Sequence, residues 1–539
     1  MQWMHTNAYY LTYKYYKFLV TRKTHSKNKK MILILKNFSN DRLHFHKPLL
    51  IMETEFEENL EVRMKNFEMY LDRTKMDHKP YQVEGVKWCL NNELRPNPPC
   101  GVRGGFIADE MGLGKTIMMI GTMICNIMKR NLIILPPALI DQWFLQIHRT
   151  TGHKALVYHG QGKKDITLEK LQKAHIVLAT YSAISFTKKQ LENPDNLLLH
   201  KTKWSRIIFD EAHHLRNSHT SLYAGAKMLK SQIRWLVSGT PVQNKKQDFY
   251  NLCSIIRLPP SFYADTNNLP ILAKEFILKR TKAMVGIKIP DVHIDETSVV
   301  WLNRKEMELS EEIHSALAFS RVTEDKSGAV ANSFRGKILS LILRARQSCI
   351  LPKLMKTNLE LLVKKGIVCD YAKYKEAFNH SSKLDAVANS ILERKGNGCG
   401  KLVFCHFQEE INEIAQRLQT GCLTDYAIFD GRTSASKRSE ILNSKKEVLI
   451  LQIQTGCEGL NLQEHYSEIY FVSPHWNPAV EDQAIARCHR IGQTKPVYVY
   501  RFTMGNFLRG EDQECDPITV EKYVNNIQEV KRVISAECM

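Results

Sequence analysis

Short apolar runs that recur along the chain, each bounded by turn residues, are the main pattern in this sequence. In the first half they include Leu132–Leu135, Ile176–Ala179 and Ile207–Phe209. Short consecutive apolar runs are typical of strands that are covered on both faces of a parallel sheet. Between them lie stretches with helical spacing, such as 138–148. This alternation predicts an α/β domain that is built on a parallel sheet.

A second alternation of the same kind begins near residue 381. Leu402–Cys405 and Val448–Leu451 have the pattern of buried strands, and 409–418 has the pattern of a helix. The residues between the two alternations are rich in Asn, Ser and Lys and show helical rather than strand patterns. We therefore expect two α/β lobes and a helical connector, with boundaries at 51–260, 261–380 and 381–539.

Glycines interrupt the chain directly after an apolar run in the first lobe, in the segment Asp109-Glu110-Met111-Gly112-Leu113-Gly114-Lys115-Thr116. A glycine-rich turn between a strand and a helix presents backbone N–H groups and the helix N-terminus to an anion, so it can bind phosphate. In such a loop Lys115 reaches the β- and γ-phosphates of a nucleotide, and the Thr116 hydroxyl holds Mg²⁺. Asp109 stands where the usual first glycine would be, so the pattern alone also allows a glycine turn that leads into a core helix.

Two adjacent carboxylates, Asp210 and Glu211, follow the apolar run at 207–209. The carboxyl ends of parallel strands form the edge where open α/β sheets bind ligands, so these acids are expected near the glycine loop. Asp210 would hold Mg²⁺, directly or through water, and Glu211 would orient and deprotonate an attacking water. Together with Lys115, the two acids predict a nucleoside triphosphatase rather than a solvated strand end.

Two arginines in the second half have a spacing that suits a polyphosphate. Gln483, Arg487 and Arg490 stand at i, i+4 and i+7, which predicts one shared helix face. A guanidinium group binds phosphate oxygens in a planar fork. Across a cleft from Lys115, Arg487 and Arg490 would act as arginine fingers. The alternative is a basic helix that lies in solvent.

Charge points to a polyanionic partner. Lys plus Arg is 76 and Asp plus Glu is 56, which gives a net charge of +20. This excess favours nucleic acid first and an acidic membrane second, and no apolar run approaches the ~18 residues that span a bilayer. Residues 1–50 are basic and aromatic, and we expect a poorly ordered tail there, with a nucleic-acid arm as the alternative. The 13 cysteines include no CxxC pair, which fits an intracellular, reducing compartment.

In their order and detail, these motifs resemble those of the Swi/Snf-type DNA-dependent ATPases of helicase superfamily two. The resemblance runs from about residue 76 to about 535. The segment 109–116 is similar to this family's form of the phosphate loop, and 210–213 resembles its motif II. Further segments match the Q element (79–85), motif Ia (136–143), motif III (238–244), two connector blocks (276–282 and 345–349), motif V (456–463) and motif VI with its approach (476–493).

The resemblance implies two RecA-like lobes with ATP and Mg²⁺ between them and duplex DNA across both. It implies catalytic roles for Lys115, Glu211, Arg487 and Arg490, and metal binding by Thr116 and Asp210. The Q element places an adenine contact on Gln82, whose amide can both donate and accept. Beyond Lys115 and Thr116, the residues expected to contact the nucleotide are Gln82, Asp109, Glu110, Met111, Gly112, Leu113, Gly114 and Gln483.

Members of the family translocate on double-stranded DNA without separating its strands. We therefore expect a DNA-dependent ATPase that remodels protein–DNA complexes, from a cell or a large DNA virus. Its expected partners are duplex DNA, bound through phosphates, and DNA-bound proteins or transcription machinery, with no membrane. The expected location is a nucleus or a viral replication compartment. Two other hypotheses are a strand-separating DNA or RNA helicase and a scaffold with an inactive ATP site, and the complete set of site residues argues against the scaffold.

Overall fold

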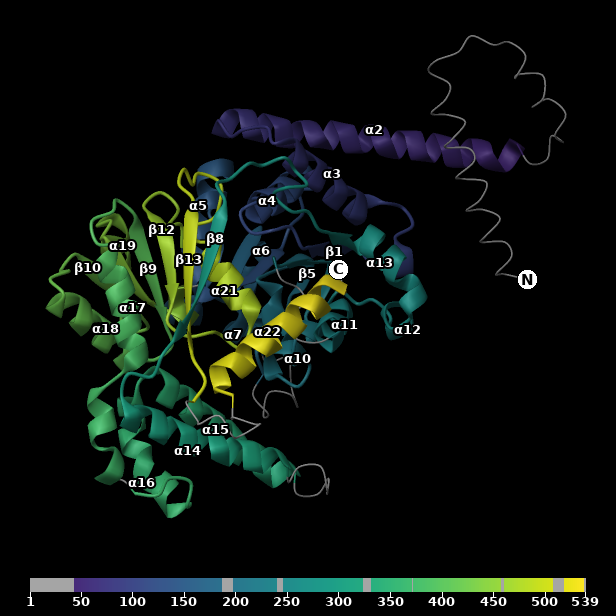
Figure 1. Cartoon of the computed structure of the whole chain (residues 1–539). Helices are drawn as coiled ribbons and strands as arrows, with labels where there is room; N and C mark the ends of the chain where they lie inside the picture. The colour runs from purple at the N-terminus through teal and green to yellow at the C-terminus, as the bar shows by residue number, and fades with distance from the viewer. Residues whose placement is uncertain are drawn as a thin grey trace, which may run out of the picture. The chain divides into compact units, whose positions relative to one another are not determined.

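The computed structural model describes residues 43–186, 197–239, 246–322, 331–370, 372–456, 460–507 and 518–537. The chain divides into two units, Met1–Arg63 and Met64–Met539. Of the first unit the structure describes 43–63, which is the first part of helix α2 (Leu43–Thr74). The other described elements belong to the second unit (Figure 1).

The expectation of a poorly ordered tail is only partly tested. Residues 1–42 lie outside the described residues, whereas 43–50 are helical because α2 begins at Leu43. The expectation was therefore wrong for 43–50. Once the later turns of α2 have formed, extending the helix by further residues costs little. Although α2 has 32 residues, no helix in the described part of the chain is long and apolar enough to cross a bilayer.

The first lobe is built on a parallel sheet. Among the described residues, seven strands pair in the order β3-β4-β2-β5-β6-β1-β7, and each neighbouring pair is parallel. The strands are β1 (Gly104–Ile107), β2 (Asn131–Leu135), β3 (Leu156–Tyr158), β4 (Ile176–Thr180), β5 (Lys203–Asp210), β6 (Lys230–Val237) and β7 (Ile277–Leu278). Central strands such as β2 and β4 are buried along their whole length, as their apolar runs predicted.

Along the chain the helices of this lobe lie between its strands, except for α3, which precedes β1 (Figure 1). They are α3 (Pro80–Leu94), α4 (Lys115–Cys125), α5 (Ile140–Thr151), α6 (Leu168–Lys173), α7 (Tyr181–Ile184), α9 (Leu198–Lys201), α10 (Ser221–Met228), α11 (Lys246–Ile255), α12 (Pro260–Tyr263) and α13 (Leu269–Phe276). Pro80 opens α3, where the missing N–H of proline costs no helical hydrogen bond.

A buried ion pair joins α3 to the middle of the first sheet. The guanidinium group of Arg206 in β5 donates to Glu93 in α3, with an Nε–Oε1 distance of 2.6 Å. Both side chains are fully buried. Trp235 in β6 donates its indole N–H to the same carboxylate at 2.8 Å. Because an unpaired buried charge is costly, these contacts hold α3, and with it Gln82, at a fixed place beside the sheet.

The second lobe has a parallel sheet of its own. Its strands pair in the order β10-β11-β9-β12-β13-β8 in the part of the chain that the structure describes. They are β8 (Val292–Val299), β9 (Gly400–Cys405), β10 (Tyr426–Phe429), β11 (Val448–Gln452), β12 (Tyr466–Phe471) and β13 (Val497–Met504). The two sheets confirm the predicted fold class, an α/β protein with two RecA-like, parallel-sheet lobes.

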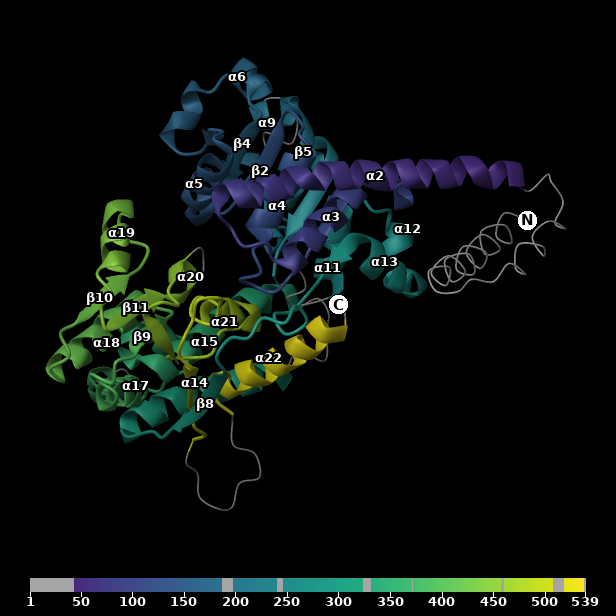
Figure 2. The ribbon, with the colours of Figure 1, turned by 90° about the horizontal axis from the view of Figure 1, so that it is seen from above.

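The helices of the second lobe form two apolar cores with its sheet: α14 to α18 and α22 contribute to one, and α19, α20 and α21 contribute to the other. In Figures 1 and 2, α22 lies against α15 and β13. The helices are α14 (Arg304–Val322), α15 (Ala331–Ile350), α16 (Lys356–Lys364), α17 (Ser382–Glu393), α18 (Gln408–Thr420), α19 (Ala435–Asn443), α20 (Ile453–Gly456), α21 (Pro478–Ile485) and α22 (Val520–Glu537).

The expected connector, 261–380, contributes to both lobes. Its strand β7 pairs with β1 at the edge of the first sheet, and β8 pairs with β13 at the edge of the second. Leu309 and Ala345, from α14 and α15, lie in one core of the second lobe. The boundaries at 260 and 381 therefore need correction, because they leave two edge strands outside their sheets. The sequence analysis missed β8 since most of its side chains are exposed and polar, unlike a buried strand.

Candidate active site

The turn after β1 has the backbone of a phosphate loop. Gly112 and Gly114 have φ values of 90° and 80°, a left-handed conformation that glycine adopts without strain. Gly114 precedes α4 directly as its N-cap residue and has no side chain with which to cap that helix. Gln82 holds the loop from α3, because its Nε2 donates to the carbonyl of Leu113 at 3.1 Å and leaves no room for a Cβ at Gly114. The helix N-terminus is therefore open to an anion.

Lys115, the first residue of α4, folds back onto this loop. Its Nζ donates to the carbonyl of Asp109 at 2.9 Å and lies 3.4 Å from the carbonyl of Glu110. Burial lowers the pKa of Lys115, and the charges of Glu211 and Asp210 act in the opposite direction. A phosphate in the loop would compete with the two carbonyls for this ammonium group.

Asp210 ends β5 and is held at both carboxylate oxygens. Its Oδ2 accepts the indole N–H of Trp143 at 2.7 Å, and its Oδ1 accepts the backbone N–H of Glu211 at 3.0 Å. The hydroxyl of Tyr181 donates to its backbone carbonyl at 2.7 Å. Burial and the neighbouring charge of Glu211 raise the pKa of Asp210. A cation bound beside the pair would favour the ionised form.

Glu211 stands at a backbone position that few residues other than glycine adopt. Its φ and ψ are 50° and 49°, which costs roughly 1–3 kcal/mol of strain in such regions. Nδ1 of His213 lies 3.2 Å from its Oε2. Burial alone would raise the pKa of Glu211, but His213 and Lys115 lower it below its usual value. The ionised carboxylate is the form that can accept a proton from water.

The donor set around these acids fits a magnesium ion. The side chains of Thr116, Asp210 and Glu211 line the same pocket. Hydroxyl and carboxylate oxygens are the ligands that Mg²⁺ prefers. Oε2 of Glu211 is buried and lies 3.2 Å from Nδ1 of His213, and since a carboxylate oxygen has two lone pairs, one remains for a metal-bound water.

The two arginines lie in the same pocket, but not on one helix with Gln483. Helix α21 ends at Ile485, and Arg487 and Arg490 follow in a turn. The prediction of a shared helix face was wrong, because α21 ends two residues before Arg487, whose carbonyl accepts the N–H of Leu462 at 3.2 Å. Arg490 donates to Oδ1 of Asn461. Gln483 is buried and does not line the pocket.

The pocket that collects these groups has a volume of about 250 Å³ and is lined from both lobes. It brings together nine residues that the sequence analysis selected: Met111, Gly112, Gly114, Lys115, Thr116, Asp210, Glu211, Arg487 and Arg490. Positive groups therefore flank a pair of acids on two sides. This arrangement suits a polyphosphate with a divalent cation and an activated water.

Five other expected contacts lie outside the pocket lining, namely Gln82, Asp109, Glu110, Leu113 and Gln483. Asp109 is fully buried and pairs with Arg280, with a distance of 2.5 Å between Oδ2 and Nη2. Glu110 pairs with Lys282 at 2.8 Å. These loop side chains thus point to the segment after β7, and only their carbonyls reach Lys115. The adenine contact of Gln82 stays a prediction.

Sequence reasoning missed the residues that support the loop and complete the pocket. Arg280 and Lys282 belong to a block that the resemblance had marked only as part of the connector. Lys282 also donates to the carbonyl of His489 at 3.1 Å, between the two arginines. The pocket lining further includes Ile117, Leu139, Gln142, Trp143, Gln146, Asn461 and Ala486. A sequence signal existed for Trp143, since it ends the motif Ia segment, but not for its bond to Asp210.

Two of the motifs are only partly described. Residues 240–244 of motif III and 457–459 of motif V lie outside the described residues. Of motif III, Gly239 approaches the phosphate loop: a Cβ there would lie 3.5 Å from Nζ of Lys115 and 3.0 Å from Cγ of Met111. A larger residue at this position would press on the loop.

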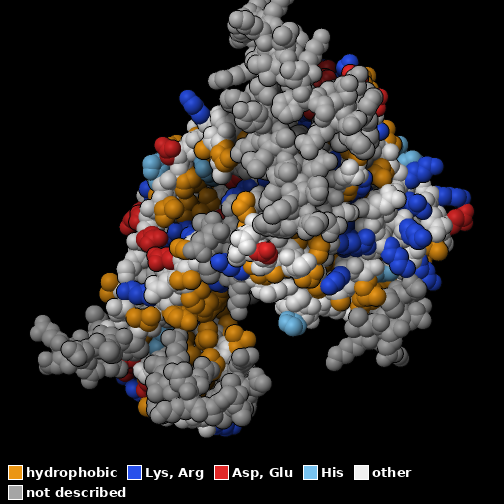
Figure 3. Space-filling model, turned by 90° about the vertical axis from the view of Figure 1, so that its right-hand side faces the viewer, with side chains coloured by type: hydrophobic (Ala, Val, Ile, Leu, Met, Phe, Trp, Pro, Cys, Tyr) orange, Lys and Arg blue, Asp and Glu red, His pale blue; other side chains and the backbone are white. Residues whose placement is uncertain are grey.

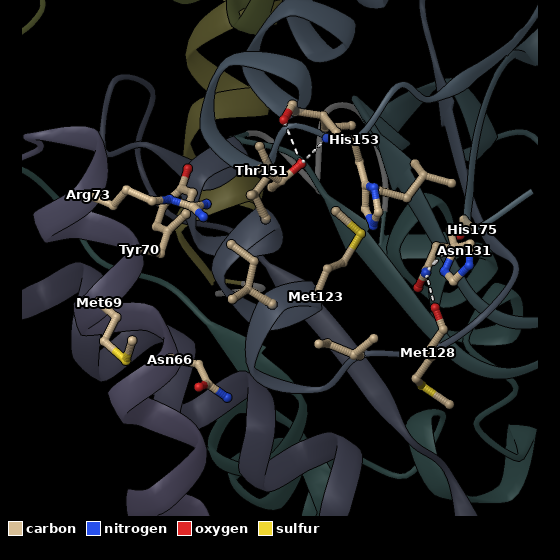
Figure 4. Close-up of a pocket in the computed structure, with 15 residues that line it drawn as sticks. Asn66, Met69, Tyr70, Arg73, Met123, Met128, Asn131, Thr151, His153 and His175 are labelled. Carbon is tan, nitrogen blue, oxygen red and sulfur yellow. Dashed lines mark hydrogen bonds between the residues drawn. The ribbon is translucent and has the colours of Figure 1, made fainter.

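A second cavity of about 380 Å³ lies at the opposite edge of the first sheet (Figure 4). Asn131 and Ile176, which open β2 and β4, line it together with the end of α4, including Met123. None of its described lining residues is Asp, Glu or Lys. Its described lining includes Arg73, whose guanidinium group can bind phosphate, but no carboxylate for a divalent cation and no glycine turn, so we expect the nucleotide in the pocket at the carboxyl edge.

Comparison with known proteins yields the same two-part division. Residues 81–267 match the family described as SNF2-related domain, and 382–492 match the helicase conserved C-terminal domain. A probable global transactivator of Orgyia pseudotsugata multicapsid polyhedrosis virus is 28% identical over 479 residues, covering 84% of this chain and 89% of the viral protein.

Two cellular relatives are longer than this chain. An uncharacterised ATP-dependent helicase of Mycoplasma genitalium is 29% identical over 479 residues, which cover 83% of this chain and 42% of that protein. The ATP-dependent DNA helicase DDM1 of Arabidopsis thaliana is 25% identical over 466 residues, covering 79% of this chain and 58% of that one. The chain thus spans most of the viral relative and less than two thirds of the cellular ones.

Proposed function

Because this chain belongs to the Swi/Snf-type ATPases of helicase superfamily two, we propose that it hydrolyses ATP in response to double-stranded DNA and translocates along that DNA. The observation that carries the proposal is the pocket shared by Lys115, the acids Asp210 and Glu211, and the arginines Arg487 and Arg490. The first three residues come from one lobe and the arginines from the other. Hydrolysis in such a pocket is coupled to the relative movement of the lobes.

Each group has a chemical role in this proposal. The loop N–H groups and Lys115 hold the β- and γ-phosphates, while Thr116 and Asp210 hold Mg²⁺. When bound, Mg²⁺ neutralises charge on the phosphate oxygens. Glu211 orients the attacking water and accepts its proton. Arg487 and Arg490 stabilise the charge that develops on the transferred phosphoryl group.

The charge of the chain supports DNA as the partner. The net charge is +20, and Figure 3 shows Lys and Arg side chains gathered on one side of the face that it draws. Lys and Arg bind DNA mainly through backbone phosphates, which gives binding that depends on salt and only weakly on sequence. We therefore expect the DNA concentration needed for half-maximal stimulation to rise steeply with ionic strength.

The decisive experiment is a steady-state ATPase assay with duplex DNA, single-stranded DNA and single-stranded RNA side by side. The proposal expects duplex DNA to raise kcat most. If RNA or single-stranded DNA stimulates and duplex DNA does not, the chain is instead a strand-separating helicase, a reading that the helicase names of two relatives favour.

Translocation needs a separate measurement, because ATPase stimulation alone does not report movement. A translocase displaces a third strand from a DNA triplex in an ATP-dependent reaction but does not separate the two strands of the duplex. Loss of the duplex in the same assay would contradict the proposal and support the helicase.

The proposed cellular role is the remodelling of protein–DNA complexes. One relative is a probable global transactivator of a virus, which supports DNA-bound proteins or transcription machinery as partners. The proposed location is a nucleus or a viral replication compartment. A displacement assay with a protein bound to duplex DNA tests this role directly, and no ATP-dependent displacement would contradict it.

A further inference from the structure

One side chain in the nucleotide pocket has no role in the proposed reaction although it touches the expected metal ligand. Trp143 is 1% exposed, and its indole N–H donates to Oδ2 of Asp210 at 2.7 Å. An indole has a single donor and no acceptor, so this bond uses the whole polar capacity of the side chain.

The bond fixes the orientation of the carboxylate. Oδ1 of Asp210 accepts the N–H of Glu211, and Oδ2 accepts the indole of Trp143, so rotation of the carboxyl group would break one of two hydrogen bonds. Each oxygen keeps a second lone pair. Without the indole donor, only the bond to the backbone of Glu211 would orient the carboxylate.

The bond between Trp143 and Asp210 also connects Asp210 to a helix. Trp143 lies in the first half of α5, from which Gln142 and Gln146 also line the pocket. Trp143 and Ile147 pack into the lobe, whereas Asp141 and Gln142 are exposed. The indole therefore joins Asp210 at the end of β5 to a helix that has one face in the core.

We propose that Trp143 is a positioning residue that holds Asp210 in the orientation required to bind Mg²⁺. A hydrogen-bond partner of a metal ligand tunes metal affinity even though it does not touch the metal. Loss of such a partner costs roughly 10–100-fold in metal affinity or activity. The proposal rests on the function proposed for this pocket.

The test compares two substitutions of the same kind. Trp143→Phe removes the indole donor and keeps an aromatic ring in the core. Trp204→Phe is the matched control: Trp204 is 2% exposed in the same lobe, and its indole N–H donates at 2.8 Å to the carbonyl of Leu199, which does not line the pocket.

The measurement is the Mg²⁺ requirement for binding a fluorescent ADP analogue, without DNA. For Trp143→Phe we expect the half-saturating Mg²⁺ concentration to rise roughly 10–100-fold, while affinity in EDTA changes less than about 3-fold. Raised Mg²⁺ should restore much of the turnover. Trp204→Phe should behave as the unsubstituted chain.

An unchanged Mg²⁺ requirement in Trp143→Phe, or an equal loss of affinity with and without Mg²⁺, would overturn the proposal. If this variant does not fold, the seven tryptophans of the unsubstituted chain decide the matter by ¹⁵N-indole NMR. One indole N–H resonance should move when Mg²⁺ is added to the ADP-bound protein. No movement of any of them would refute the role of Trp143.

The assay separates this proposal from the wider one. A rate of ATP hydrolysis that does not change when duplex DNA is added would contradict the proposed function. It would leave the Mg²⁺ requirement of ADP binding unaffected. An unchanged Mg²⁺ requirement would remove Trp143 from its role and leave DNA stimulation as it was.

Discussion

The two lobes use the same structural unit, a strand that leads into a helix, in opposite ways. In the first lobe β1 leads through glycines to α4, and the N-cap residue of that helix, Gly114, has no side chain with which to cap it. In the second lobe β9 leads to α18 through His406 and Phe407, and Glu410 folds back to cap it. Oε2 of Glu410 accepts both N–H groups, from His406 and Phe407, at 2.8 Å each.

Because of this difference, we expect the first lobe and not the second to bind the phosphates. A helix N-terminus binds an anion through its free N–H groups and its dipole. In the second lobe a carboxylate of the chain already occupies that position and is fully buried. The second lobe instead contributes cations from a turn, Arg487 and Arg490. One lobe is therefore expected to bind the nucleotide and the other to complete the reaction.

The largest expected effect on turnover comes from a substitution at the N-terminus of α4. Lys115→Ala should reduce turnover to background, because the ammonium that faces the phosphates is lost. ATP affinity should also fall, by roughly 1.5–3 kcal/mol for a hydrogen bond to a charged group. The measurements are steady-state ATPase activity and equilibrium nucleotide binding. Lys129→Ala, an exposed lysine after α4, is the control, and a normal rate in Lys115→Ala would rule out the phosphate loop.

A substitution at the arginines of the second lobe should lower turnover but leave nucleotide affinity nearly unchanged. Arg490→Ala should lower kcat by roughly 10³–10⁵-fold, because the developing phosphoryl charge loses its guanidinium partner. Nucleotide affinity should stay within a few-fold, since the first lobe makes the phosphate contacts. Single-turnover kinetics measure the effect on the chemical step, and ADP binding measures the effect on nucleotide affinity. Arg532→Ala, on an exposed pair with Asp482, serves as the control, and unchanged turnover in Arg490→Ala would remove its finger role.

A third prediction concerns the stability of each lobe. Arg206→Met leaves Glu93 unpaired in the first lobe, and Lys383→Met leaves Glu521 unpaired in the second. Each should cost roughly 3–5 kcal/mol of unfolding free energy, the usual penalty for stranding a buried charge. Denaturant unfolding with limited proteolysis should show the loss in the lobe that carries the substitution. Equal loss in both lobes would mean that they unfold as one cooperative unit.

The smallest effect should come from the cap of α18. Glu410→Ala should cost the second lobe roughly 0.5–2 kcal/mol, the usual value of a helix cap. Glu410→Gln keeps an oxygen that can accept from both N–H groups and should cost less. Denaturant unfolding of both variants measures the difference, and equal stability of Glu410→Ala and the unsubstituted chain would contradict the capping role.

The same residue predicts a pH dependence. Burial raises the pKa of Glu410 from 4.5 to about 7, although the backbone N–H groups act against it. The folded state thus favours the protonated form of Glu410. The resulting stabilisation is complete below the pKa of the unfolded chain and is lost as pH rises through about 7. Glu410→Gln cannot titrate and should show a flatter stability profile across this range. A profile identical to that of the unsubstituted chain would exclude Glu410 as its source.

Local patterns were sufficient to locate the strands, the glycine turn before α4 and the two acids at the end of β5. Buried runs such as 176–179 predict strands because both faces of the sheet are covered, and Gly112 and Gly114 predict the loop through their backbone freedom. Asp210 and Glu211 follow from the rule that parallel strands bring ligand residues to one edge.

Local patterns failed where a distant backbone group changed the outcome. The i, i+4, i+7 spacing of Gln483, Arg487 and Arg490 fits a helix, but the N–H of Leu462 takes the carbonyl of Arg487 and the helix has already ended. Strand β8 was missed because an edge strand with exposed polar side chains has no apolar run. Such features depend on partners that lie far away in the sequence.

By itself the sequence determined which chemical groups are available and which strand ends carry them, because apolar runs and glycine turns act over a few residues. Only the tertiary structure decided what those groups contact. Asp109 and Glu110 face Arg280 and Lys282 rather than the pocket, and Trp143 reaches Asp210 across 67 residues of chain. The physical reason is that buried charges and donors must find partners, and folding, not sequence distance, brings those partners close.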